Sequence, residues 1–219
     1  MWQFFFLLAA ILLIGVLIPQ LLIRGAIGSW FRVFVVPGVI LHELSHALAC
    51  FLVGAKIHRI RLFKKTGGDV THESSKIPIV GPLIITLAPL IIGFLVSLWI
   101  GHRLLPFIHH WPTGLSLTDF PSLLWLIIRN LNWHSITTWV WLYLLLSIGA
   151  TMTPSWKDFY NSLFSLIVLV AIVYFLHKWI NWSGYLHYVI PILTLLLFVL
   201  SVSLVFSLVI YLISLIFVI

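Results

Sequence analysis

Two histidines and a glutamate stand inside an apolar stretch of the chain, in the sequence PGVILHELSHALAC that covers residues 37–50. His42 and His46 are four residues apart, so on a helix they lie on one face, one turn apart. Their imidazole nitrogens can therefore bind one metal ion. Glu43 lies about 60° around such a helix from His46, where its carboxylate reaches a water on that ion without being a ligand. This H-E-x-x-H spacing predicts two zinc ligands and a general base.

The position of Glu43 strengthens this interpretation. The residue lies midway between Arg32 and Lys56 in an otherwise apolar run, which predicts a place near the middle of a membrane. An ionised side chain at that depth costs at least about 3 kcal/mol, so it indicates a functional group. The alternative is a polar cluster that only holds helices together, but such a cluster does not need this spacing.

A hydrolytic zinc site usually has three protein ligands and one water, so a third ligand is required. We favour Asp158, which follows the break that Pro154 imposes between two apolar runs. Asp158 also fits a capping box with Ser155 as the N-cap, and a capping carboxylate need not touch a metal. Spacing alone leaves both roles open. The other candidates for the third ligand are Asp119, His72, His102, His109, His110 and His134.

Composition indicates a membrane protein. Of 219 residues, 62% are hydrophobic and 8% are charged, whereas soluble domains have about 25% charged residues. We expect an all-α polytopic bundle of about six transmembrane helices that forms one domain over residues 1–219, with the first apolar run kept as a span rather than removed as a signal peptide. The segment 121–131 is too short to cross alone. The predicted spans are 2–23, 32–55, 77–101, 135–153, 159–180 and 189–219.

The net charge of +7 does not point to nucleic acid, because the basic residues lie mostly between apolar runs, where orientation signals belong. The dense basic loop 56–65 predicts the cytoplasmic side. Both termini are then cytoplasmic as well, and the plasma membrane of a prokaryote is the expected location.

The loop 56–76 has a pattern of its own. Ile60 and Leu62 alternate with arginines, and Gly-Gly-Asp follows at 67–69. Alternation followed by a turn signal predicts a short β-hairpin, which we expect at the membrane surface. The alternative is a basic loop that only anchors the orientation of the chain.

These elements together resemble the site-2 protease family of intramembrane zinc metalloproteases. The resemblance consists of PGVILHELSHALA, a basic loop with Gly-Gly, IVGPL at the start of the next span and a Pro-to-Asp element. It covers about residues 31–165, with extra helices expected at 1–23 and 189–219. The family's aspartate lies in Asn-x-x-Pro-x-x-x-x-Asp-Gly. Here Thr151 stands in place of the asparagine, Phe159 in place of the glycine, and the spacing is one residue shorter. The departures from the family's pattern lead us to expect a divergent, compact member without an appended PDZ-like domain.

The resemblance implies an enzyme, a zinc-dependent intramembrane endopeptidase. One Zn²⁺ would be held by His42, His46 and Asp158, with Glu43 as the catalytic base and Thr151 as a residue that positions substrate.

The implied partners are the lipid bilayer and a transmembrane or membrane-bound protein substrate. An extended substrate segment would pair with the edge of the hairpin near Ile60 and Leu62. The alternative function is a metal-binding membrane scaffold or chaperone-like protein without proteolytic activity. Glu43 argues against it, because a structural zinc site needs no base.

Overall fold

The computed structural model describes residues 2–24, 34–62, 68–104, 119–176 and 182–216. These residues form seven helices and one two-stranded antiparallel sheet, which confirms the predicted helical class and the predicted hairpin. In chain order the elements are α1 (Trp2–Arg24), α3 (Val36–Leu52), β1 (Ile57–Arg61), β2 (Asp69–His72), α4 (Val80–Leu104), α5 (Phe120–Asn130), α6 (Ile136–Thr151), α7 (Trp156–Leu176) and α8 (Trp182–Ile216).

Prolines set several of the helix boundaries. Pro37 occupies the first turn of α3, where its missing N–H has no helical partner in any case. The break predicted at Pro154 is confirmed, because α6 ends at Thr151 and α7 begins at Trp156. By contrast, α8 begins earlier than the predicted run at 189 and continues through Pro191.

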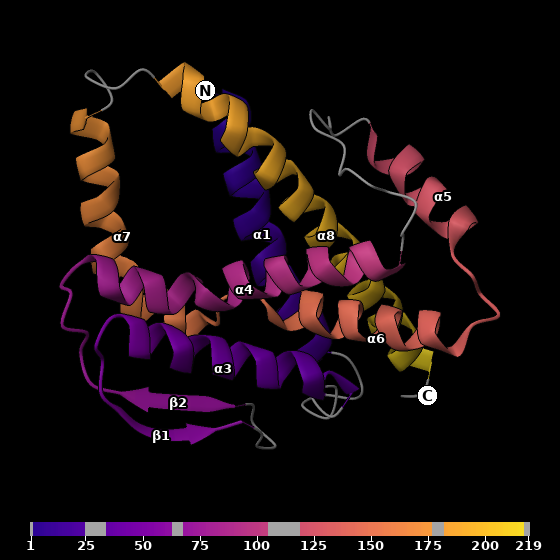
Figure 1. Ribbon diagram of the computed structural model, residues 1–219, viewed down its shortest axis with the longest axis horizontal. Helices are drawn as coiled ribbons and strands as arrows, with labels where there is room; N and C mark the ends of the chain where they lie inside the picture. Colours follow the sequence, from indigo (N-terminus) through magenta and orange to yellow (C-terminus); the bar gives the residue numbers. More distant parts are fainter. Residues whose placement is uncertain (1, 25–33, 63–67, 105–118, 177–181, 217–219) are drawn as a thin grey trace.

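The helices fall into two groups (Figure 1). In the first group α3, α4 and α6 pack against one another, and α7 packs against α4. In the second group α1 and α8 lie side by side and run obliquely to the first group, which α8 joins through α6. The largest apolar cluster of the described residues has most of its buried members on α1 and α8, and it extends to Val39 of α3, Phe94 of α4 and Ala150 of α6. Its members on α1 and α8 are Leu7, Ile11, Ile18, Leu195, Leu196, Leu197, Phe198 and Leu200.

The hairpin runs back along α3 rather than standing away from the helices (Figure 1). The chain reverses at Gly54, whose φ of 67° suits glycine. Arg61 on β1 then pairs with Asp69 on β2. The five residues of β1 cover about 16 Å, close to the length of α3 between its C-terminus and its middle. The far end of the hairpin therefore reaches Glu43, because Gly68 lies against its side chain. The place of the hairpin at the membrane surface stays a prediction.

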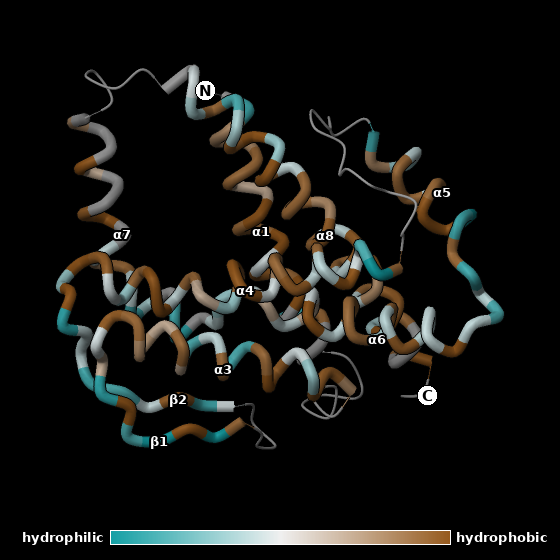
Figure 2. The backbone as a smooth tube through the Cα atoms, viewed as in Figure 1, coloured by the Kyte–Doolittle hydropathy of each residue, from teal (hydrophilic) through white to brown (hydrophobic). Residues whose placement is uncertain are grey.

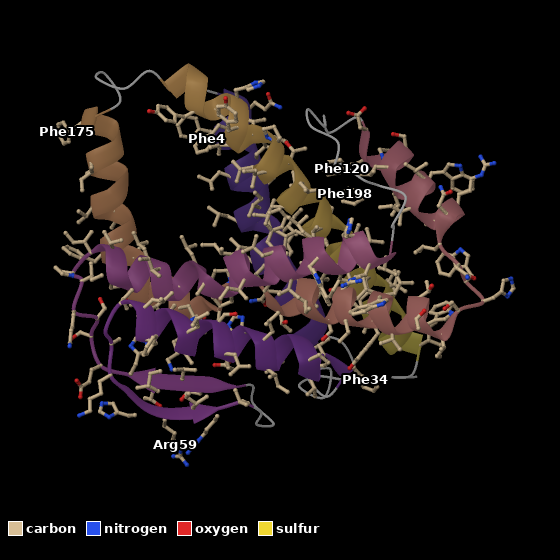
Figure 3. The ribbon with its side chains drawn as sticks, viewed as in Figure 1. Phe4, Phe34, Arg59, Phe120, Phe175 and Phe198 are labelled. Atoms are coloured by element: carbon tan, nitrogen blue, oxygen red, sulfur yellow. The ribbon has the colours of Figure 1, made fainter. Side chains whose placement is uncertain are left out.

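The helices consist mostly of hydrophobic residues (Figure 2). Large hydrophobic side chains such as Phe34, Phe164 and Phe175 are more than 60% exposed, and Phe34 and Phe175 lie on the outside of the fold (Figure 3). Exposed apolar area of this extent marks a membrane or partner surface.

Two helices of the described chain are long and apolar enough to span a membrane by themselves, within α4 and α8. Apolar stretches in α1, α3 and α6 are shorter. The 16 residues of α6 rise about 24 Å, less than the hydrocarbon thickness of about 30 Å. The number of six spans and the orientation of the chain stay predictions.

Candidate metal centre

His42 and His46 lie on the same face of α3, as their spacing requires. Their Nε2 atoms are 3.1 Å apart, and the two rings meet edge to face. Oδ2 of Asp158, from the first turn of α7, lies 3.4 Å from Nε2 of His46 and 3.8 Å from Nε2 of His42. Three potential ligand atoms from two helices thus surround one point. Within the part of the chain that the structure describes, these three residues form the candidate group for holding a metal ion.

The spacing of these atoms fits zinc. Two ligands of a tetrahedral zinc ion, each about 2.0–2.1 Å from the metal, lie about 3.3 Å from each other. The three observed separations range from 3.1 to 3.8 Å. Two imidazole nitrogens and one carboxylate oxygen are also a donor set that zinc hydrolases use, with a fourth position left for water. The residues therefore fit this ion in type and in geometry.

Both histidines are oriented through their second ring nitrogen. Nδ1 of His42 lies 2.7 Å from the carbonyl oxygen of Thr151, and Nδ1 of His46 lies 2.8 Å from that of Ile85. A carbonyl oxygen only accepts hydrogen bonds, so each Nδ1 carries the hydrogen and donates it. Each Nε2 is then left with a lone pair that points at the common centre. Ligand histidines in metal sites are commonly fixed in this way.

Asp158 is both a helix cap and a member of the cluster. The N–H and the hydroxyl of Ser155 donate to Oδ2 of Asp158 at 2.9 and 2.5 Å, and the N–H of Asp158 donates to the Ser155 hydroxyl at 3.2 Å. This is the capping box that the sequence predicted. The two roles left open by the sequence are therefore compatible, because the cap holds the carboxylate beside the two histidines.

A close helix crossing sets the distance between α3 and α6. The N–H of Gly38 donates to the Ser147 hydroxyl at 2.9 Å. A Cβ atom at Gly38 would collide with the carbonyl oxygen of Ser147 and with the hydroxyl of Thr151. Gly38 and His42 are one turn apart on α3, as are Ser147 and Thr151 on α6. The glycine contact therefore brings the Thr151 carbonyl within reach of His42.

Glu43 is buried, with 7% of its surface exposed. A methyl group at Gly68, just before β2, would collide with the Glu43 side chain, so the end of the hairpin lies directly over this carboxylate. Next to this contact, Nζ of Lys157 on α7 forms an ion pair of 2.9 Å with Oδ1 of Asp69 on β2. The hairpin is thus held over the space between α3 and α7.

The other predicted residues do not belong to the group of three ligands, wherever the structure describes them. His72, His102, Asp119 and His134 are described and are not part of the metal group, whereas His109 and His110 lie outside the described residues. Thr151 contributes its backbone carbonyl, and its hydroxyl donates to the carbonyl of Ser147 within α6 at 3.0 Å. Ile60 and Leu62 are exposed on the hairpin, at 44% and 36%.

Sequence reasoning missed four residues that support the cluster. Gly38 and Gly68 make close approaches, Ile85 supplies a carbonyl, and the hydroxyl of Thr86 donates to the Asp158 carbonyl at 3.0 Å. One signal was available for Gly38, since a small residue one turn before His42 permits a close helix crossing. The others depend on partners that are distant in sequence.

The comparison with known families agrees with this geometry. The model of the Peptidase M50B-like family matches residues 7–180, which include every member of the cluster. No curated protein and no solved structure matched the chain. The family is that of site-2 protease-like intramembrane metalloproteases, which confirms the resemblance seen in the sequence. The chain belongs to the Peptidase M50B-like family.

Proposed function

We propose that this protein is a zinc-dependent intramembrane endopeptidase that cuts membrane-embedded or membrane-associated proteins. Membership of the family and the His-His-Asp group indicate metallopeptidase activity. The observation that carries the finer proposal is the convergence of His42, His46 and Asp158 beside a buried glutamate. A structural zinc site would need no acid or base at this position, so Glu43 favours hydrolysis over a scaffold role.

The roles of the residues follow from their chemistry. Nε2 of each histidine and Oδ2 of Asp158 would hold one zinc ion, which supplies polarisation of the scissile carbonyl and makes water more acidic. Glu43 accepts the proton of the attacking water and then delivers it to the leaving amine. Its burial keeps bulk water from competing for this proton, and the hydrogen bonds at Nδ1 keep both imidazoles in place throughout.

Glu43→Gln tests this assignment, because glutamine keeps the shape of the side chain and removes its basicity. Purified chain in lipid nanodiscs would be loaded with zinc and incubated with single-span model substrates that contain helix-breaking residues. We expect one zinc per chain in wild type and variant, measured by elemental analysis, with cleavage lost only in the variant. Cleavage at the wild-type rate by Glu43→Gln would rule out the proposed base.

The hairpin supports a way of presenting the substrate. Peptide bonds in a helix have their carbonyls hydrogen-bonded, so a membrane substrate must be locally extended before attack. An extended segment can add to the free edge of a hairpin through backbone hydrogen bonds. Here Ile60 is paired with Val70 and remains exposed, and Gly68 lies against Glu43. A strand added to this sheet would run toward the cluster.

Ile60→Pro and Leu62→Pro test strand addition, because proline removes an N–H and disfavours strand pairing. We expect at least a tenfold loss of cleavage rate with zinc content unchanged. Ile60→Thr is the matched control, since threonine keeps the N–H and the β-propensity, and it should cleave at nearly the wild-type rate. Normal cleavage by folded, zinc-loaded proline variants would contradict strand addition and leave the zinc assignment standing.

A further inference from the structure

Helix α4 contains a proline in its interior. Pro89 is among the most buried residues of the protein, and α4 continues on both sides of it from Val80 to Leu104. Proline has no N–H, so the carbonyl four residues earlier, that of Ile85, loses its usual helical partner. The proline ring also pushes against that carbonyl and tilts it away from the helix axis. In an apolar interior a carbonyl without a partner is unfavourable, so another donor is required.

The donor is a predicted metal ligand. Nδ1–H of His46 donates to the carbonyl oxygen of Ile85 at 2.8 Å, and this hydrogen bond is buried. The same turn of α4 also contacts the third member of the cluster, because the hydroxyl of Thr86 donates to the backbone carbonyl of Asp158 at 3.0 Å. One turn of α4, beside its proline, therefore supports the ligand from α3 and the ligand from α7.

His42 uses a carbonyl that is freed in a different way. Thr151 is the last residue of α6, so its carbonyl is one of the four that a helix end leaves without partners. The N–H of Ser155, four residues on, donates to Oδ2 of Asp158 instead. Both histidines thus donate to carbonyls that the helical hydrogen-bond pattern has released, one at a helix end and one beside a proline within a helix.

We propose that Pro89 is a positioning residue for the metal centre: it keeps the Ile85 carbonyl free for His46, so that Nε2 of His46 faces His42 and Asp158. This inference rests on the zinc site of the proposed function. A non-proline residue at this position would supply an N–H that competes with His46 for the same oxygen. The imidazole would then lose its fixed orientation, and the site would bind zinc more weakly.

The chain offers a matched control. Pro191 also lies inside a helix, α8, which contributes no residue to the metal group. Its missing N–H frees the carbonyl of His187 near the beginning of α8, away from the cluster. Pro191→Ala therefore makes the same chemical change in a helix without a ligand.

The test measures zinc affinity of the full chain in nanodiscs, by competition with a chromophoric chelator, for wild type, Pro89→Ala, Pro89→Gly and Pro191→Ala. Both Pro89 variants should bind zinc about 10- to 100-fold more weakly, the usual effect of losing a partner of a ligand histidine. Pro191→Ala should bind zinc like wild type. The thermal unfolding midpoint of the metal-free Pro89 variants should equal or exceed that of wild type, because the helical hydrogen bond is restored.

A lower zinc affinity together with an equal or higher unfolding midpoint distinguishes a positioning role of Pro89 from a role in packing alone. A loss of zinc affinity that comes with a lower unfolding midpoint in the metal-free chain would overturn the proposal, and so would collapse of both Pro89 variants. Wild-type zinc affinity in Pro89→Ala would overturn it too. If the wild-type chain itself binds no zinc, the proposed function is overturned, and the inference about Pro89 is overturned with it.

Discussion

The two groups of helices are held together by different means. In the group of α3, α4, α6 and the first turn of α7, the helices are joined by backbone carbonyls, hydroxyls and a glycine contact, as between Gly38 and Ser147. Between α1 and α8 the contact is the main part of an apolar cluster, which also extends to Val39 of α3, Phe94 of α4 and Ala150 of α6. The hydroxyls of Thr194, Ser201, Ser203 and Ser207 on α8 donate to carbonyls one turn earlier in the same helix. A ring contact of Phe198 with Phe120 adds α5 to this second group (Figure 3).

The two groups need their helices placed with different precision, because only the first group holds the metal ligands. In a bilayer the lipid is as apolar as the side chains, so apolar contact alone gives little preference for one helix position over another. A metal site needs its ligands within about 0.5 Å of their working positions. Directional hydrogen bonds and close backbone contacts supply that precision in the first group. The apolar contact between α1 and α8 has no such directional requirement.

Loss of the Asp158 carboxylate is expected to have the largest effect on the first group. Asp158→Ala removes a ligand and the cap, so we expect loss of stoichiometric zinc binding and destabilisation by about 1 kcal/mol. Asp158→Asn separates the two roles, because its amide oxygen still accepts the Ser155 N–H but carries no charge. It should unfold near the wild-type midpoint and bind zinc at least tenfold more weakly. Unchanged zinc stoichiometry in both variants would show that Asp158 only caps the helix.

Widening the α3–α6 crossing should have the next largest effect. Gly38→Ala places a methyl group against the Ser147 carbonyl, which belongs to a helix backbone and cannot yield locally. We expect the helices to separate and zinc affinity to fall about tenfold, as His42 moves away from the Thr151 carbonyl. Gly184→Ala is the control, since nothing lies within 4 Å of its added methyl group. Equal zinc affinities of the two variants would refute a role for the crossing.

A cavity at Leu200 on α8 should have the smallest effect on the metal site. Leu200 is fully buried, so Leu200→Ala should destabilise the protein by about 2–5 kcal/mol through lost packing. Zinc affinity of the folded protein should stay within about twofold of wild type, because the ligand helices keep their own hydrogen bonds. Unfolding and chelator competition on the same sample measure both quantities. A parallel loss of zinc affinity would mean that the two groups are not independent.

Local geometry explains what the sequence determined by itself. The helical class, the helix break at Pro154 and the hairpin follow from apolar runs, proline and alternation, which act over a few residues. The common face of His42 and His46 and the capping box of Ser155 and Asp158 also follow from spacings of three or four residues on one helix.

Only the tertiary structure decided how these pieces meet. The approach of Asp158 to the histidines, the choice of the Ile85 and Thr151 carbonyls and the contact of Gly68 with Glu43 join segments that are distant in sequence. Such distances depend on how helices pack, and no periodicity in the sequence encodes them. The sequence determined the chemistry of each donor and the cap that Asp158 forms, and packing decided that the same oxygen of Asp158 stands beside His42 and His46.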